Sequence, residues 1–196
     1  MKSVGRRIVR ETRETRETRV EVGLSLRGGP VAVETGVGFL DHMLETLAHH
    51  GGLGLSLRVR GDLHVDAHHS VEDASIALGR VLDEALCERQ GLARFGWAYA
   101  PLDEALARAV VDLARRSHCT FTCPSLPERI GEFPSEMTGH FFRTLASEGR
   151  FTLHLDVLRA DNGHHALESA FKALALALRQ ALVPVAQRVR STKGTL

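Results

Sequence analysis

The chain has 196 residues, 43% of them hydrophobic, which is enough for one compact domain or two small packed halves. Its 25 Lys and Arg residues against 24 Asp and Glu residues give a formal net charge of +1, so nucleic acid and anionic membranes are not expected partners. No apolar run reaches about 18 residues and the three cysteines lack CxxC spacing, so we expect a reduced, cytoplasmic protein that neither spans a membrane nor is exported.

The first half of the chain alternates predicted strands with two amphipathic helices. Apolar and polar residues alternate over 20–26, which predicts a half-buried strand closed by a Gly28-Gly29-Pro30 turn. By the same criteria, strands are predicted at 31–33, 53–59 and 63–65, and helices at 39–47 and 71–86.

The second half repeats this order. Strands are predicted at 106–113, 119–123 and 151–157, and helices at 137–145 and 166–182. We therefore predict an α+β fold made by tandem duplication of a small unit, a four-stranded sheet plus two helices. Each half alone has too little core, so the halves should pack together through their helices. The predicted repeats are 1–91 and 92–183, followed by a tail at 184–196, and they act as one functional domain.

Two short signatures, His68-His69-Ser-Val-Glu72 and His164-His165-Ala-Leu-Glu168, lie almost half the chain apart and precede the two long predicted helices. At about 100° of rotation per residue, each glutamate lies about 40–60° from its two histidines, while the histidines lie about 100° apart. Two histidines that diverge in this way cannot easily share one ion. Each signature is therefore suited to serve two metals, one histidine to each.

Two further histidines, His42 and His140, occupy matching places upstream of these signatures. Imidazoles and carboxylates together suit divalent ions such as Mn²⁺, Fe²⁺, Ni²⁺ or Zn²⁺, and the lack of thiolates gives no reason to expect a structural zinc site. A single histidine is more often a solvated or hydrogen-bonded side chain. A signature that occurs twice, each time with an upstream histidine, instead predicts a dinuclear centre with internal pseudo-symmetry.

These motifs resemble those of the imidazoleglycerol-phosphate dehydratases of histidine biosynthesis. The resemblance spans 10–196, and the segments that carry it are Thr35-Gly-Val-Gly-Phe-Leu-Asp-His-Met-Leu44, Gly61-Asp-Leu-His-Val-Asp-Ala-His-His-Ser-Val-Glu-Asp73, His164-His-Ala-Leu-Glu168 and Ser191-Thr-Lys-Gly194. It implies a fold like the second domain of ribosomal protein S5 and two Mn²⁺ ions per site. It also implies a homo-oligomer, a 24-subunit shell built from trimers, with sites between subunits and metal binding that supports assembly.

The implied activity is that of a hydro-lyase, which removes water from D-erythro-imidazole-glycerol phosphate to give imidazole-acetol phosphate. The ions would act as template and Lewis acids while a carboxylate moves the proton. The residues implied to act in catalysis are Glu17, His69, Glu72 and Glu168. The implied metal ligands are His42, His68, His69, Glu72, His140, His164, His165 and Glu168, and the sequence does not decide which ion each of them binds.

Residues 10–18 consist of three Arg-Glu-Thr repeats, which pose a problem of register. The family has one Glu-Thr just before its first strand, with the glutamate proposed as an acid/base group. Counting back from Val20 selects Glu17 for this role. We interpret Glu11 and Glu14 as part of a solvated charge run.

The resemblance also implies substrate contacts, although each of these residues taken alone would be interpreted as an ordinary surface group. They are Glu17, His42, Thr46, His50, Arg94, Arg116, Lys172, Ser191, Thr192 and Lys193. The cations among them suit a phosphate group. The chain has Arg115-Arg116-Ser117 where the family usually has Gly-Arg-Pro, so either arginine is a candidate phosphate ligand.

Two other function classes are compatible with such ligands. A dinuclear metal hydrolase could use a similar set of histidines and glutamates, although such enzymes normally show Asp-rich motifs at strand ends. A non-catalytic shell protein linked by metal ions needs no turnover at all. Dehydration of the substrate with and without Mn²⁺ separates these alternatives.

Overall fold

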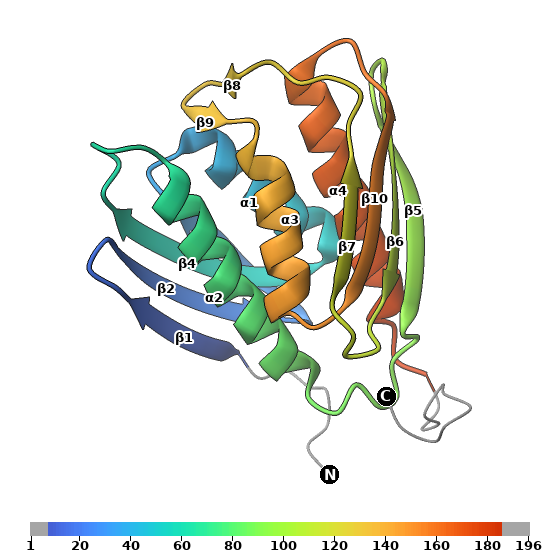
Figure 1. The fold of residues 1–196 in the computed structure, drawn as a ribbon. Helices are drawn as coiled ribbons and strands as arrows, with labels where there is room; N and C mark the ends of the chain where they lie inside the picture. Colours follow the sequence, from blue (N-terminus) through green and yellow to red (C-terminus); the bar gives the residue numbers. More distant parts are fainter. Residues whose placement is uncertain (1–7, 186–196) are drawn as a thin grey trace.

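Burial along the strands follows the alternation in the sequence. Val20, Val22 and Leu24 are buried whereas Glu21 is exposed, so one face of this strand belongs to the core and the other faces outward. The computed structural model describes residues 8–185 and shows two similar halves, each with one four-stranded sheet (Figure 1).

The first half contains one sheet in the order β1-β2-β4-β3, in which only the β3–β4 pair is parallel. Helix α1 makes the crossover between these parallel strands, and α2 follows β4. The bounds are β1 Val9–Glu14, β2 Thr18–Ser25, β3 Gly28–Glu34, α1 Gly38–Gly51, β4 Leu53–Gly61 and α2 His68–Leu86.

The second half repeats this topology in the order β5-β6-β10-β7, again with one parallel pair, β7–β10. A short hairpin, β8–β9, is added between β7 and α3. The bounds are β5 Phe95–Leu102, β6 Ala105–Asp112, β7 His118–Thr122, β8 Arg129–Ile130, β9 Phe133–Pro134, α3 Met137–Glu148, β10 Thr152–Arg159 and α4 Gly163–Ala181.

The four helices lie between the two sheets, and the main helix contacts cross from one half to the other (Figure 1). Helix α1 packs on α4, and α2 packs on α3. Gly79 permits the second contact, because a Cβ atom there would lie 2.6 Å from Cβ of Glu148 on α3. The predicted α+β duplication, with halves packed through their helices, is therefore confirmed.

Two local predictions were wrong, and two strands of the sheets were not predicted. Residues 63–65 form a turn rather than a strand, and the N–H of Val65 donates to the carbonyl of Asp62 at 2.8 Å. The fourth strand of the first sheet is β1, which comes from the charged Arg-Glu-Thr run, and β5 was also not predicted. The predicted Gly28-Gly29-Pro30 turn lies one residue earlier, at Arg27, because β3 already begins at Gly28.

Within the described part of the chain, none of the helices is both long and apolar enough to cross a membrane.

Candidate metal site

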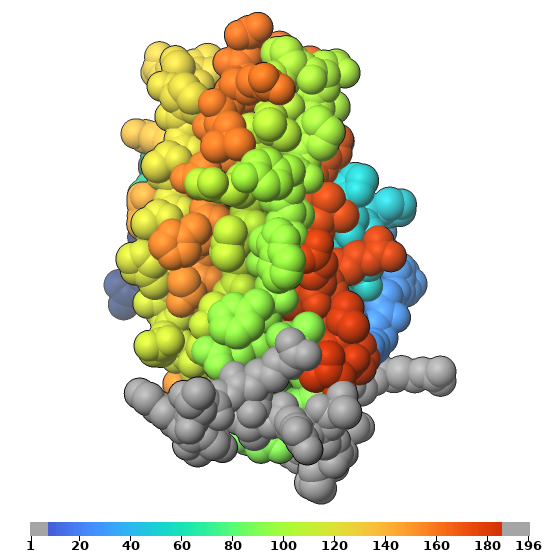
Figure 2. All heavy atoms as spheres, turned by 90° about the vertical axis from the view of Figure 1, so that its right-hand side faces the viewer, coloured from blue at the N-terminus to red at the C-terminus, as the bar shows by residue number. Residues whose placement is uncertain are grey.

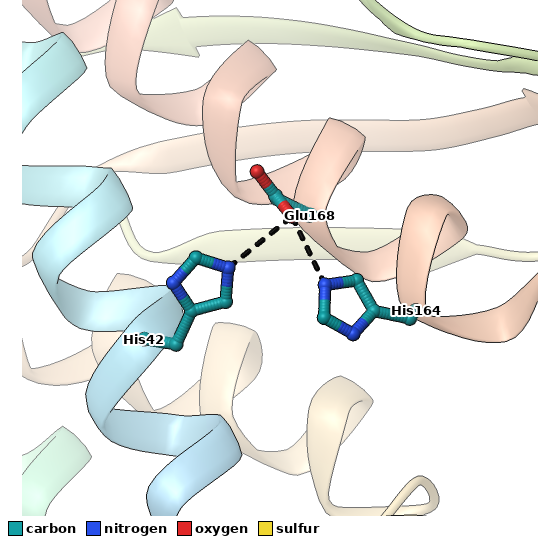
Figure 3. Close-up of side chains that lie close together, drawn as sticks. All are labelled: His42, His164 and Glu168. Atoms are coloured by element: carbon teal, nitrogen blue, oxygen red, sulfur yellow. Dashed lines mark hydrogen bonds and ion pairs between the residues drawn. The ribbon is translucent and has the colours of Figure 1, made fainter.

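One cluster of candidate ligands joins α1 to α4. Nε2 of His42 lies 3.3 Å from Oε2 of Glu168, and Nε2 of His164 lies 3.1 Å from the same oxygen (Figure 3). One ligand atom from each of the three side chains lies within 4.8 Å of the other two. The rings of His42 and His164 both turn toward this carboxylate, which is 14% exposed (Figure 3).

A second cluster joins α2 to α3. Nε2 of His140 lies 3.0 Å from Oε1 of Glu72, and the rings of His140 and His68 have centroids 5.5 Å apart. The ligand atoms of these three side chains also lie within 4.8 Å of one another.

Both clusters are built across the two halves. His42 of the first half meets the HHxxE signature of the second, while His140 of the second half meets the signature of the first. The interhelical contacts explain this exchange, because α1 packs on α4 and α2 packs on α3. Each cluster therefore requires the complete duplicated fold.

The second histidine of each signature lies outside these clusters and is held by a carboxylate. Nδ1 of His69 lies 3.0 Å from Asp62, and Nδ1 of His165 lies 2.8 Å from Glu104. These hydrogen bonds raise the pKa of both histidines, and the bond to His165 lowers the pKa of Glu104 to about 2. A carboxylate on Nδ1 favours the tautomer in which Nδ1 carries the proton, so Nε2 of each ring keeps its lone pair and is a potential ligand.

These two carboxylates were missed in the sequence. Asp62 precedes the first signature in the sequence, and Asp156 occupies a similar place before the second. Asp156 instead bonds Arg108 and Thr122 on the outer face of the second sheet, and Glu104 supplies the equivalent contact from the β5–β6 turn. The residues that precede the two signatures could therefore have indicated Asp62 but not Glu104.

A lysine neutralises the first cluster. Nζ of Lys172 lies 2.8 Å from Oε1 of Glu168, one helical turn away. Burial acts to raise the pKa of Glu168, but its bonds to Lys172, His42 and His164 outweigh burial and lower that pKa to about 2. Glu168 is therefore ionised at neutral pH, as a metal ligand must be.

Other predicted substrate contacts lie on α1. His50 is exposed, but partial desolvation of its ring and the charge of Lys172 lower its pKa. Thr46, one turn earlier, is 8% exposed. Ser191, Thr192 and Lys193 lie outside the described residues.

The predicted phosphate arginines lie at the other ends of the long helices. Arg94 donates its backbone N–H to the carbonyl of Ala181, at the end of α4, whereas His164 is near its start. This helix has 19 residues, or about 28 Å at about 1.5 Å per residue. Within one chain, Arg94 therefore lies far from the first cluster, and its guanidinium pairs with Asp112 at 2.7 Å.

The two remaining arginine candidates differ in their surroundings. Nη2 of Arg115 donates to the carbonyl of Cys87, just beyond the end of α2. Arg116 is exposed, and its carbonyl accepts a hydrogen bond from Thr152. His68 lies at the start of α2, so the end of α2 near Arg115 is also a full helix length from the second cluster.

Glu17 lies in the connection between β1 and β2. Its Oε2 is 3.7 Å from Nε2 of His69, and the side chain is 55% exposed. Glu11 and Glu14 belong to β1, where Glu11 contacts Arg80 and Glu14 pairs with Arg19. Of the three glutamates in the repeats, the structure brings Glu17 to a histidine of the signature.

The chain is similar to known proteins over most of its length. The model of the imidazoleglycerol-phosphate dehydratase family matches residues 35–178 of the chain, a span that includes both clusters. The chain belongs to the imidazoleglycerol-phosphate dehydratase family.

Individual members of this family are similar over most of the chain. Imidazoleglycerol-phosphate dehydratase from Candida glabrata is 53% identical over 86% of this chain and 81% of that protein. The enzyme of the same name from Salinibacter ruber is 51% identical over 90% of this chain and 89% of that protein.

Solved structures of imidazoleglycerol-phosphate dehydratases share the fold. The structure from Staphylococcus aureus has a TM-score of 0.84 at 36% identity and covers 91% of this chain and 100% of its own. The structure from Pyrococcus furiosus has a TM-score of 0.82 at 34% identity, with coverage of 95% and 100%. This chain is therefore an enzyme of the same fold and family.

The ion pair between Glu104 and His165 generates a test of pH dependence. The pKa of Glu104 falls from 4.5 to about 2, so this residue contributes stability that is present above pH 4.5 and lost as the pH falls through 2. The pKa of His165 rises above 6.5, so its contribution is present below 6.5 and lost as the pH rises through the higher value. The pair therefore stabilises the protein most between pH 4.5 and 6.5.

We expect Glu104→Gln, which keeps a carbonyl acceptor for the backbone N–H groups of Asp161 and Asn162, to lower the free energy of unfolding most in this pH window. The measurement is urea unfolding of the metal-free protein across pH. A deficit of equal size from acidic to alkaline pH would contradict the ion pair.

Proposed function

We propose that the chain catalyses the metal-dependent dehydration of D-erythro-imidazole-glycerol phosphate to imidazole-acetol phosphate, a step of histidine biosynthesis. The observation that carries the proposal is the pair of clusters, each with two imidazoles and one carboxylate within 4.8 Å, in a chain of this family. The names of these two relatives support the substrate.

The donor set fits two divalent ions, and we propose Mn²⁺ as the resident metal. Imidazole and carboxylate donors suit such ions, and three ligands per cluster leave coordination positions open. When bound, the ions would act as Lewis acids and as a template that orients the substrate. His42, His164 and Glu168 would hold one ion, and His68, Glu72 and His140 the other.

We further propose that each site is shared between copies of the chain. His69 and His165 lie outside the clusters of their own chain, with their Nδ1 atoms held by carboxylates, so they are suited to complete clusters in a neighbouring copy. Arg94 and Arg115 lie a helix length from the ligands of their own chain, which also supports a contribution from another copy. The expected assembly is a 24-mer built from trimers, as the family resemblance implies.

In this shared site, the reaction depends on residues that hold the substrate and move a proton. Lys172, the arginines and the Ser191-Thr192-Lys193 segment would bind the phosphate, and His50 and Thr46 would contact the substrate. Glu17, 3.7 Å from His69, would transfer the proton as an acid/base group.

Removal of the metal tests the function directly. We expect the chelated protein to lose dehydratase activity and to regain it when Mn²⁺ is added, since the clusters would otherwise lack the ions that orient the substrate. The measurement is formation of imidazole-acetol phosphate by the purified protein. Absence of activity with metal and assembly intact would exclude the enzyme and favour a metal-linked shell.

The proposed role of Glu17 is tested by Glu17→Gln. We expect turnover to fall by about 10²- to 10⁴-fold, the usual contribution of a positioned acid/base group, while the protein still binds its metal. Glu14→Gln is the matched control, because Glu14 occupies the same place in the preceding Arg-Glu-Thr repeat but lies on β1. Equal turnover in the two variants would remove Glu17 from the catalytic residues.

A further inference from the structure

A buried carboxylate lies next to the metal ligands on α2. Asp73 directly follows Glu72 and is 4% exposed. Its Oδ1 accepts a hydrogen bond from Nε of Arg13 at 2.9 Å, and its Oδ2 accepts a short hydrogen bond from the hydroxyl of Thr18. Both oxygens therefore bind the strands that flank the β1–β2 connection, with Arg13 on β1 and Thr18 on β2.

The hydrogen bonds continue into this connection. Oγ1 of Thr15 lies 3.3 Å from Oγ1 of Thr18 and accepts hydrogen bonds from the backbone N–H groups of Glu17, at 3.2 Å, and Thr18, at 3.0 Å. The backbone N–H of Thr15 also donates to the carbonyl of Thr18 at 2.9 Å. These contacts fix the backbone from which the Glu17 side chain reaches His69.

The second half lacks this arrangement at the equivalent position. Ser169 follows Glu168 as Asp73 follows Glu72, but its hydroxyl donates within α4 to the carbonyl of Ala166 at 2.9 Å. The matching β5–β6 turn carries Glu104, which bonds Nδ1 of His165 directly. The network around Asp73 is therefore confined to the half that carries Glu17.

We propose that Asp73 is a positioning residue, which holds Glu17 beside His69 through Arg13 and Thr18; this inference rests on the proposed function of Glu17. Because the Glu17 side chain is 55% exposed, its placement depends on the backbone that carries it. Asp73 ties that backbone to the helix that presents His68 and Glu72. Proton donor and metal ligands thus share one rigid support, which enzymes use to hold reacting groups in position.

Substitutions at Thr18 test the proposal without changing the helix. We expect Thr18→Val to lower kcat by about 10- to 100-fold, the cost of a small displacement of a reacting group, with KM and bound Mn²⁺ unchanged. Thr18→Ser keeps the hydroxyl and should restore kcat. Arg13→Met removes the other donor, from a side chain that is 26% exposed, and should lower kcat in the same way if Thr18→Val fails to fold.

The decisive measurement is the effect of Thr18→Val on the residual turnover of Glu17→Gln. If Asp73 acts through Glu17, the double variant has the same kcat as Glu17→Gln alone. Thr122→Val is the matched control. Thr122 donates to Asp156 at 2.6 Å, and Asp156 also bonds Arg108, so this is a similar Thr–Asp–Arg group on the outer face of the second sheet. The kcat of Thr122→Val should equal that of the wild type.

Several results would overturn the proposal. A wild-type kcat in Thr18→Val, a loss of bound Mn²⁺, or an equal further loss in the Glu17→Gln background would each show that Thr18 does not act through Glu17. Wild-type protein that binds Mn²⁺ but does not dehydrate the substrate would instead refute the proposed function, and with it the role given to Asp73.

Discussion

The packing of each helix against a helix of the other half is the constraint on which the candidate site depends. Because α1 packs on α4 and α2 on α3, His42 and His140 reach the signatures of the opposite half. Neither half alone can form a three-residue cluster of this kind. The duplication thus explains two features together, a core large enough to fold and two matching sets of candidate ligands.

The matching ligands have unlike surroundings. Asp62 comes from a loop before α2, whereas Glu104 comes from a hairpin turn, yet both bond Nδ1 of the second histidine in a signature. Lys172 neutralises Glu168, and Asp73 bonds strands of the first sheet. The two halves therefore place unlike groups around their matching clusters.

Most of the fold could be predicted from the sequence because the patterns that determine its helices and strands are local. Alternation and helical spacing predicted most elements, and the repeated HHxxE signature indicated the histidines and glutamates that the structure brings together in two clusters. The strand β1 was missed because Arg10 to Glu14 has no apolar alternation, and its strand conformation comes from pairing with β2. Glu104 was missed for a similar reason, since it meets His165 only when α4 and the β5–β6 turn come together in space.

We propose that each shared site combines the first cluster of one chain with the second cluster of another. It is tested most directly by co-expression of His164→Ala and His68→Ala chains with different tags. Each variant alone should be inactive, while the purified mixed oligomer should recover part of the wild-type dehydratase activity, because some sites then contain two intact clusters. Mixed oligomers without activity, although they assemble and bind Mn²⁺, would contradict the shared site.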